Sequence, residues 1–237
     1  SDHLITARPR LAARPVILHH GAMEPSPGHW HPVLASTEVG KQPIARTRFG
    51  KQLVFWRSAN NVVCMPDRCP HRGAALSLGR VNGTAIACPF HGLEYAPNGQ
   101  CVGIPVETDN RIPDGFAIES FPAVEADGYI WLWRGPTTTH DNKPPVPQHA
   151  ALVGMRYGEA RSIWNAHYTR CIENVCDYSH LPFVHRTTIG MAQRDPHTDI
   201  EIEDLPGGFR AYLLKNGKRG QHLEFLYPNL WMLKISD

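Results

Sequence analysis

The sequence predicts an α+β protein whose first half is built from short antiparallel strands. Its 237 residues include 20 glycines and 21 prolines, which favour many short strands and turns over long helices. Three apolar segments with the length of strands follow Trp30, at Gln52–Trp56, Val62–Cys64 and Ile130–Trp133. Residues 162–179 contain neither proline nor glycine and predict a helix in the second half.

Turn residues separate the predicted strands. Ser58–Asn61 is expected to form the turn of a hairpin between the first two strands, and Asp127–Gly128 forms a turn before the third. In the second half, Asn216–Gly217 predicts a type I′ turn between the strands Gly208–Lys215 and His222–Tyr227. The helix is therefore expected to precede a set of antiparallel strands.

Composition divides the chain into four parts. Residues 1–29 form an irregular N-terminal segment, and residues 30–136 form the first domain. Residues 137–148 are polar and rich in proline, which is typical of a linker, and residues 149–237 form the start of a second domain.

Charge and hydropathy narrow the possible partners. Lys+Arg 24 against Asp+Glu 22 leaves a net charge of +2, so no nucleic-acid partner is expected. No apolar run reaches the roughly 18 residues that span a bilayer, and the cluster Val16–Leu18 is too short for a secretory signal. We therefore expect a cytoplasmic protein without a membrane partner. In that compartment its six cysteines would bind metal or do chemistry more often than form disulfides.

Two short segments each place a cysteine and a histidine on one turn. Cys69-Pro-His71 and Cys88-Pro-Phe-His91 are separated by sixteen residues. Two thiolates and two imidazoles suit either a tetrahedral zinc ion or a Rieske [2Fe-2S] cluster, in which two cysteines bind one iron and two histidines the other. Structural zinc sites usually pair cysteine with cysteine on each turn. Here each turn contributes one residue of each type, which favours the cluster over a zinc-binding interaction module.

Glycines and the remaining cysteines fit the same interpretation. Gly73 and Gly92 follow the two ligand pairs, where the backbone must bend sharply and present N–H groups to the cluster sulfurs. The other cysteines match no ligand spacing and are expected to be small buried apolar side chains; they are Cys64, Cys101, Cys171 and Cys176.

The sequence around these turns resembles the Rieske domain of ring-hydroxylating oxygenases. CPHRGAALSLGRV and CPFHGLEY carry the resemblance, which extends from about Trp30 to Trp133. High-potential Rieske proteins have further cysteines beside the ligands, and here Ala74 and Phe90 stand in those places. Leu93 stands where many aromatic-ring dioxygenases have tryptophan. This variant is similar to the group that has α subunits alone, which includes aromatic O-demethylases and related monooxygenases.

A second group of candidate metal ligands lies in the predicted helical region. Asp177-x-x-His180-x-x-x-x-His185 places a carboxylate and two imidazoles close together in the chain. On a helix, positions 174, 177 and 180 share one stripe, and Pro182 is expected to break that helix and let His185 return beside His180. Two histidines and one carboxylate form the facial triad of non-haem Fe(II) oxygenases. Alone, the spacing is equally compatible with structural histidines.

The segment resembles the mononuclear-iron motif N-x-x-D-x-x-H-x-x-x-x-H of the same family. This resemblance implies that His180 and His185 bind iron. It also implies that Asp177 is no ligand but bridges His180 to a Rieske histidine of the neighbouring subunit, equivalent to His91, as an orienting carboxylate. Asn174 corresponds to the family's asparagine near the iron; its alternative role is that of an amide on the helix surface.

The family's third iron ligand is a carboxylate far downstream, and no residue matches it. Asp195, Asp199 and Asp204 lie too close to His185 and belong to no recognisable motif. The segment after the linker is also shorter than the family's catalytic domain. We therefore expect the sequence to be a part of a longer protein.

The resemblance implies the catalytic α subunit of a Rieske non-haem iron oxygenase. Its implied fold is an antiparallel β Rieske domain followed by an incomplete helix-grip (Bet v 1-like) catalytic domain. Electrons would come from NAD(P)H through a separate reductase or ferredoxin, because no G-x-G-x-x-G follows a predicted strand. They would pass through the [2Fe-2S] cluster to a mononuclear Fe(II). There O2 would be activated to hydroxylate or O-demethylate a small aromatic substrate.

The implied assembly is a homotrimer, and two other functions stay open. One is the α subunit of a cis-dihydroxylating dioxygenase that also has a β subunit. The other is a Rieske electron carrier without oxygen chemistry, which Asp177, His180 and His185 oppose because a carrier has no use for a second iron site.

Overall fold

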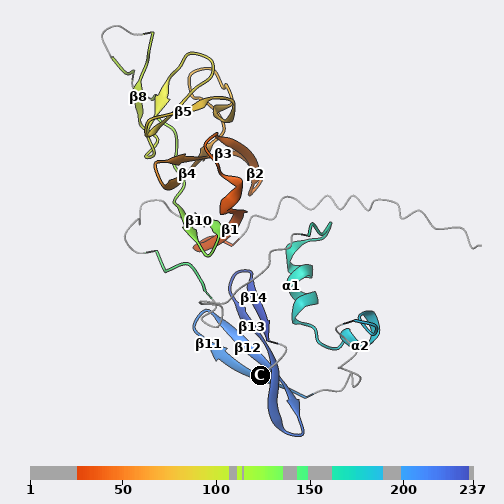
Figure 1. The fold of residues 1–237 in the computed structure, drawn as a ribbon. Coiled ribbons are helices and arrows are strands. Elements are labelled where there is room, and N and C mark those ends of the chain that lie inside the picture. Colours follow the sequence, from red (N-terminus) through yellow and green to blue (C-terminus); the bar gives the residue numbers. More distant parts are fainter. Residues whose placement is uncertain are drawn as a thin grey trace, which may run out of the picture.

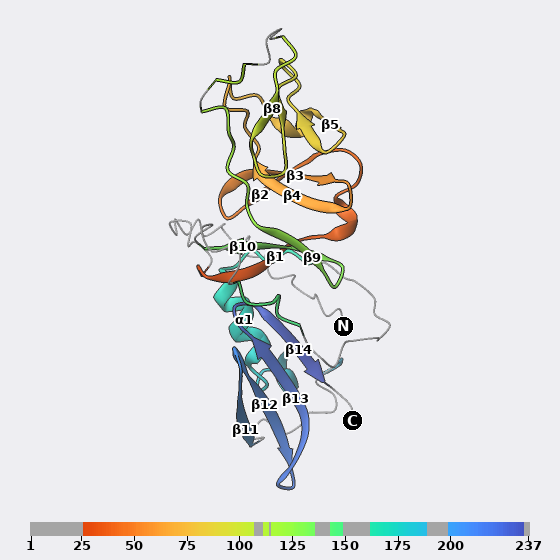
Figure 2. The same ribbon diagram turned by 90° about the vertical axis from the view of Figure 1, so that its left-hand side faces the viewer.

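The computed structural model describes residues 26–106, 111–113, 115–135, 143–148, 162–188 and 199–234. Strands β1 to β10 form one part of the molecule, and α1, α2 and β11 to β14 form the other (Figure 1). Figure 2 shows the same two parts from the side, with β1, β9 and β10 facing the second part. Within these residues, no helix has the length and apolar character needed to cross a bilayer.

Three antiparallel sheets form the first part. Their strand orders are β1-β10-β9, β2-β3-β4 and β5-β6-β7-β8. The strands are β1 (His29–Ala35), β2 (Ile44–Arg48), β3 (Lys51–Ser58), β4 (Asn61–Pro66), β5 (Arg80–Asn82), β6 (Ala85–Ala87), β7 (Glu94–Tyr95), β8 (Cys101–Gly103), β9 (Ala123–Ala126) and β10 (Tyr129–Arg134). Two short 3₁₀ turns lie at Ser36–Glu38 and Leu76–Leu78.

Strand β3 lies between two apolar cores, because successive side chains of a strand point to opposite faces. Leu53 and Phe55 pack in the core that contains the residues of β1 and β10. Val54 and Trp56 pack in the other core, together with Tyr95, and none of these three residues is exposed. This second core also contains the cysteines of the two predicted ligand turns, so the sheet β2-β3-β4 supports them directly.

The predicted turns of the first part are confirmed. The hairpin of β3 and β4 turns at Ala59, and that of β9 and β10 turns at Asp127–Gly128. Ala59, Asp127 and Gly128 have positive φ angles of 52°, 51° and 78°, the backbone conformation that a tight primed turn requires.

The second part is a four-stranded antiparallel meander with two helices. The elements are α1 (Tyr168–Cys176), α2 (Leu181–Val184), β11 (Ile200–Leu205), β12 (Gly208–Lys215), β13 (Lys218–Leu226) and β14 (Leu230–Lys234). Asn216 and Gly217 have φ angles of 53° and 72° between β12 and β13, which confirms the predicted hairpin. Ile172 and Val175 of α1 pack against Leu223 of the sheet.

The predicted helix of residues 162–179 is shorter in the structure, and the reason expected for its end is wrong. His167 accepts a hydrogen bond from the Thr169 N–H and begins α1, and Asp177 leaves the helical conformation with φ −88° and ψ 112°. Pro182 does not end this helix but lies in the first turn of α2. A proline fits that position because its missing N–H would have no partner there.

Contacts from the linker and the second part reach the first part. Trp30 Nε1 donates to the Pro144 carbonyl at 2.8 Å, which fastens residues 143–148 of the predicted linker. Tyr227 at the end of β13 donates its hydroxyl to Ser26 at 3.0 Å, and its ring lies 4.6 Å from the ring of His29. The rest of the predicted linker and residues 1–25 lie outside the described residues.

Candidate metal centres

The two cysteine–histidine turns have the same backbone hydrogen bonds. In each turn the cysteine N–H donates to the carbonyl five residues later, and the cysteine carbonyl accepts from the glycine four residues later. The pairs are Cys69 N–Ala74 O (2.8 Å), Gly73 N–Cys69 O (2.8 Å), Cys88 N–Leu93 O (2.8 Å) and Gly92 N–Cys88 O (3.1 Å). The turns are therefore two copies of one local structure.

The predicted bend at both glycines is confirmed. Gly73 and Gly92 have φ angles of 74° and 75°, in the left-handed region that a glycine enters without steric cost. A Cβ on Gly92 would lie 3.1 Å from Pro105 Cγ, so this turn also packs closely against the chain beyond β8.

The turns hold the thiols inward and the imidazoles outward. Cys69 and Cys88 are each 2% exposed and belong to the apolar core, whereas His71 is exposed and His91 is half-buried. The centroids of the two histidine rings lie 4.8 Å apart. The four side chains therefore form a pair of sulfurs and a separate pair of rings.

This separation fits a two-iron cluster better than a single zinc ion. A tetrahedral zinc ion needs all four donors around one point. In the described part of the chain, no three His, Cys, Asp or Glu side chains lie close enough together to hold one ion. A Rieske cluster instead takes two thiolates on one iron and two imidazoles on the other.

Tyr95 is a site residue that the sequence interpretation did not single out. Its hydroxyl lies 3.3 Å from the Cys69 sulfur, and its ring is fully buried in β7. Burial, followed by the interaction with Cys69, raises the pKa of Tyr95 well above its usual range. Burial also raises the pKa of the Cys88 and Cys101 thiols. The one available sequence signal was that Tyr95 closes the segment CPFHGLEY.

The structure brings His180 and His185 together across the single turn of α2. Their ring centroids lie 5.4 Å apart in an edge-to-face arrangement, and both residues are half-buried. His180 precedes α2 and His185 follows it, with the Val184 N–H donating to the His180 carbonyl at 2.9 Å. The expected proximity is confirmed, and a one-turn helix starting at a proline produces it.

Asp177 lies beside His180 with its carboxylate partly in solvent. One carboxylate oxygen accepts from the Ser179 N–H at 2.8 Å and the Ser179 hydroxyl at 2.5 Å. The other lies 3.5 Å from His180 Nδ1, a buried atom without a hydrogen bond. The hydrogen bond from the Ser179 hydroxyl is the largest cause that lowers the pKa of Asp177, so the group is ionised at neutral pH. The side chain is 47% exposed.

The structure places Asn174 and two of the three downstream aspartates at the surface. Asn174 is exposed on α1, as a surface amide would be. Asp199 and Asp204 are exposed at β11, and Asp195 lies outside the described residues. Among the described side chains, no carboxylate joins His180 and His185 in a group of three metal donors.

The remaining cysteines are free thiols in the structure. Cys64 and Cys101 are buried, which confirms their expected place in the core. Cys171 and Cys176 are only half-buried, and Cys176 packs at the edge of the core between α1 and the sheet.

Two family models match separate parts of the chain. Residues 29–122 match the Rieske [2Fe-2S] domain, and residues 164–226 match the vanillate O-demethylase oxygenase C-terminal domain. The first segment contains both cysteine–histidine turns, and the second contains α1, α2 and most of the sheet.

Characterised relatives match most of the chain. It is 31% identical to the oxygenase component of dicamba O-demethylase from Stenotrophomonas maltophilia, over 81% of this chain and 59% of that protein. It is 32% identical to methylxanthine N1-demethylase NdmA from Pseudomonas putida, over 76% of this chain and 53% of that protein. The chain spans about half the length of the curated relatives it matches.

Solved structures show the same fold. Pseudomonas putida NdmA superposes with a TM-score of 0.77 at 27% identity, over 89% of this chain and 64% of that one. Dicamba monooxygenase bound to dicamba superposes with a TM-score of 0.68 at 25% identity, over 85% of this chain and 64% of that one. The predicted α+β fold is thereby confirmed.

Proposed function

Since the chain belongs to the family of Rieske non-haem iron oxygenases, we propose that it is part of a terminal oxygenase component that hydroxylates or O-demethylates a small aromatic substrate. The family carries a Rieske [2Fe-2S] cluster in its first domain and a mononuclear iron in its catalytic domain. When bound, the cluster supplies single electrons and the mononuclear iron activates dioxygen.

The observation that carries the proposal is the pair of matched turns together with a separate histidine pair. We assign Cys69 and Cys88 to one cluster iron and His71 and His91 to the other. The inward thiols and outward rings support this assignment. We assign His180 and His185 to the mononuclear iron, which the 5.4 Å separation of their rings supports.

Asp177 orients His180 in this proposal and connects the two centres between subunits. Its ionised carboxylate lies next to the buried His180 Nδ1, where it can accept a hydrogen bond from the Nδ1–H and fix the ring. His91 is half-buried and Asp177 is exposed on a single chain, so a contact between copies could bring the two centres together. We therefore propose a homotrimer with this contact at each interface. Asn174 takes a supporting position near the iron.

The electron donor is proposed to be a separate reductase or ferredoxin. The names of two relatives support this: one is the oxygenase component of dicamba O-demethylase, and the other is a putative iron-sulfur subunit of a toluene-4-sulfonate monooxygenase system. For the substrate, the names of the relatives supply the support: dicamba O-demethylase, vanillate O-demethylase and methylxanthine N1-demethylase. These names share one reaction, the removal of a methyl group from a ring compound.

A dioxygenase is the second candidate, because the chain is also 30% identical to the oxygenase subunit of 3-chlorobenzoate-3,4-dioxygenase from Comamonas testosteroni over 81% of its length. Isotopically labelled O2 distinguishes the two reactions. A monooxygenase or demethylase places one labelled atom in the organic product, or in the formaldehyde released from it, whereas a dihydroxylating enzyme places two labelled atoms in one product.

Iron content tests the assignment of residues. The purified protein is expected to hold about three irons per chain, two in the cluster and one mononuclear. Cys88→Ala should remove two of them together with the visible absorbance of the cluster, and His180→Ala should remove one and keep the absorbance. Two irons in the unaltered protein would support an electron carrier, and unchanged iron in His180→Ala would overturn the second site.

A further inference from the structure

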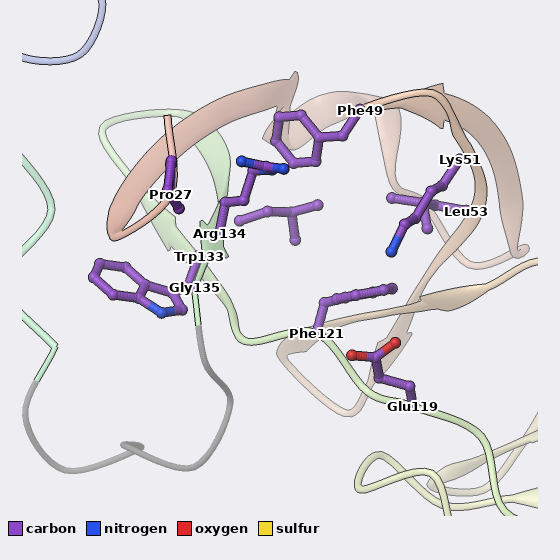
Figure 3. Close-up of a pocket in the computed structure, with 10 residues that line it drawn as sticks. Pro27, Phe49, Lys51, Leu53, Glu119, Phe121, Trp133, Arg134 and Gly135 are labelled. Atoms are coloured by element: carbon purple, nitrogen blue, oxygen red, sulfur yellow. The ribbon is translucent and has the colours of Figure 1, made fainter. Parts of the chain in front are cut away.

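A second kind of site lies in the first part of the chain, where a cavity of about 370 Å3 opens between β3 and β10. None of the proposed metal ligands lines it. The side chains that give the cavity its chemistry are Phe49, Lys51, Glu119, Phe121, Trp133 and Arg134. In Figure 3 the Lys51 and Arg134 side chains lie on opposite sides, and the rings of Phe49 and Phe121 lie between them above and below.

Phe49 adopts a backbone conformation that its residue type disfavours. It forms the β2–β3 turn with Gly50, and the two have φ angles of 53° and 72°. Asparagine, aspartate or glycine usually fill such a position, and a bulky side chain costs on the order of 1 kcal/mol there. The Phe49 ring also lies edge-to-face with His31 at 5.4 Å. Strained residues of this kind gather at ligand sites, and this one forms a wall of the cavity.

The cavity is rich in hydrogen-bond donors and positive charge. Lys51 Nζ lies 5.5 Å from the centre of the Phe121 ring and, among the described residues, forms no ion pair. Trp133 is 9% exposed, and its buried Nε1 makes no hydrogen bond within the structure described. Arg134 adds a guanidinium group, so two positively charged side chains line the cavity. A buried donor without an acceptor is uncommon, and the Trp133 N–H is such a donor in a residue that lines the cavity.

We propose that this cavity binds a small aromatic carboxylate. The Lys51 ammonium would receive the carboxylate, and Phe49 and Phe121 would hold the ring between Lys51 and Arg134. The volume lies at the small end of the range for ligand pockets, which suits one ring. Glu119 at the same cavity disfavours more highly charged anions such as phosphate. This site lies outside the proposed iron centres, and its existence does not depend on the proposed function.

Calorimetric titration of the iron-loaded protein with benzoate tests the proposal. Benzamide serves as the uncharged ligand of the same shape, and inorganic phosphate serves as the anion without a ring. The titration is repeated in the His180→Ala/His185→Ala background, which removes the proposed mononuclear site as a competing location for benzoate. We expect one benzoate site in both backgrounds, with affinity at least about tenfold above that for benzamide or phosphate.

Two variants locate the binding. Lys51→Gln should weaken benzoate binding about tenfold by removing the charge, and Phe49→Asn should weaken it at least about threefold. Asparagine adopts the left-handed backbone conformation more readily than phenylalanine does, so Phe49→Asn removes the ring while keeping the fold. Lys41→Gln, at an exposed lysine outside the cavity, is the matched control and should leave the affinity unchanged.

Several results would overturn the proposal. They are no benzoate binding, equal affinity for phosphate, loss of the site in the histidine background, or unchanged affinity in Lys51→Gln and Phe49→Asn. Three irons per chain would still support the proposed oxygenase in each of these cases, so the two proposals fail separately.

Discussion

The Tyr95 hydroxyl lies 3.3 Å from the Cys69 sulfur, in the core behind the two ligand turns. A cysteine that binds iron has lost its proton, so the hydroxyl must be the donor of this hydrogen bond once the cluster is in place. Hydrogen bonds to cluster sulfurs stabilise the reduced form, which carries more negative charge. In the proposed site, Tyr95 would therefore tune the cluster through Cys69.

Tyr95→Phe is expected to lower the reduction potential of the cluster, on the order of tens of millivolts. The ring remains to fill the core, and only the hydroxyl is lost. A spectroscopic redox titration of the purified protein measures the shift. An unchanged potential, with an unchanged spectrum, would mean that Tyr95 only packs.

The left-handed glycine after His91 leads to a second prediction. Gly92→Ala would place a methyl group 3.1 Å from Pro105 Cγ on a backbone with φ 75°, so we expect a marked loss of bound cluster. Gly83→Ala is the matched control, because Gly83 has φ 59° but nothing within 4 Å of the added carbon. Its effect should be limited to the backbone cost of about 1 kcal/mol. Visible absorbance per protein reports cluster content, and equal losses in the two variants would contradict the prediction.

Local patterns in the sequence predicted the two ligand turns, two hairpins and the turn at Asp127–Gly128, because turn-forming residues such as glycine and asparagine act on the backbone within a few residues. The end of α1 was predicted wrongly. Residues 162–179 contain no helix breaker, but His167 and Asp177 begin and end the helix through their own hydrogen bonds and backbone conformation. The predicted proximity of His180 and His185 is nevertheless found, because the single turn of α2, with Pro182 in it, brings the two rings together as the expected helix break would have done.

Contacts between distant segments could not be predicted in this way. Tyr95 meets Cys69 across 26 residues, and both reach the same core only through the pairing of β6 and β7. The cavity beside Phe49 combines the β2–β3 turn with residues of β10, more than 80 positions later in the printed sequence. Neither segment contains a motif, so the site becomes visible only when the strands are placed.

The partly exposed ion pair between Arg57 and Glu125 predicts how the stability of the fold depends on pH. Arg57 donates to both carboxylate oxygens of Glu125, at 2.7 and 3.2 Å, and to the carbonyls of Ser36 and Val39. The hydrogen bonds from Arg57 are the main cause that lowers the pKa of Glu125 below its usual 4.5. A lowered pKa means that this contribution to stability is present above the unfolded pKa and is lost as pH falls through the folded one.

Glu125→Gln should therefore unfold more easily than the unaltered protein at pH 7, by about 1 kcal/mol or less because the carboxylate is partly exposed. The difference should shrink as the pH falls below about 4.5 and close only below the lowered folded pKa of Glu125, where both proteins carry a neutral side chain. Denaturant titrations at pH 7 and at lower pH measure it. Glu201→Gln, at the more exposed pair with Arg219, is the comparison and should show a smaller difference. A difference that grows as the pH falls would contradict the assignment.

Asp177→Asn separates orientation from metal binding. The asparagine can still accept from Ser179, so the turn into α2 should persist, but the negative charge beside His180 Nδ1 is lost. Both metal centres should stay occupied while turnover falls roughly 10- to 100-fold, the usual effect of removing a partner of a metal-binding histidine. Iron content and the cluster spectrum provide the first measurement, and turnover with a reductase and substrate provides the second.

Ser179→Ala is the comparison for Asp177→Asn. It removes one hydrogen bond to Asp177 but keeps the negative charge, so its turnover should fall much less. Normal turnover in Asp177→Asn would contradict the proposed role of Asp177 between subunits. A carboxylate that connects the two metal centres cannot lose its charge without slowing turnover.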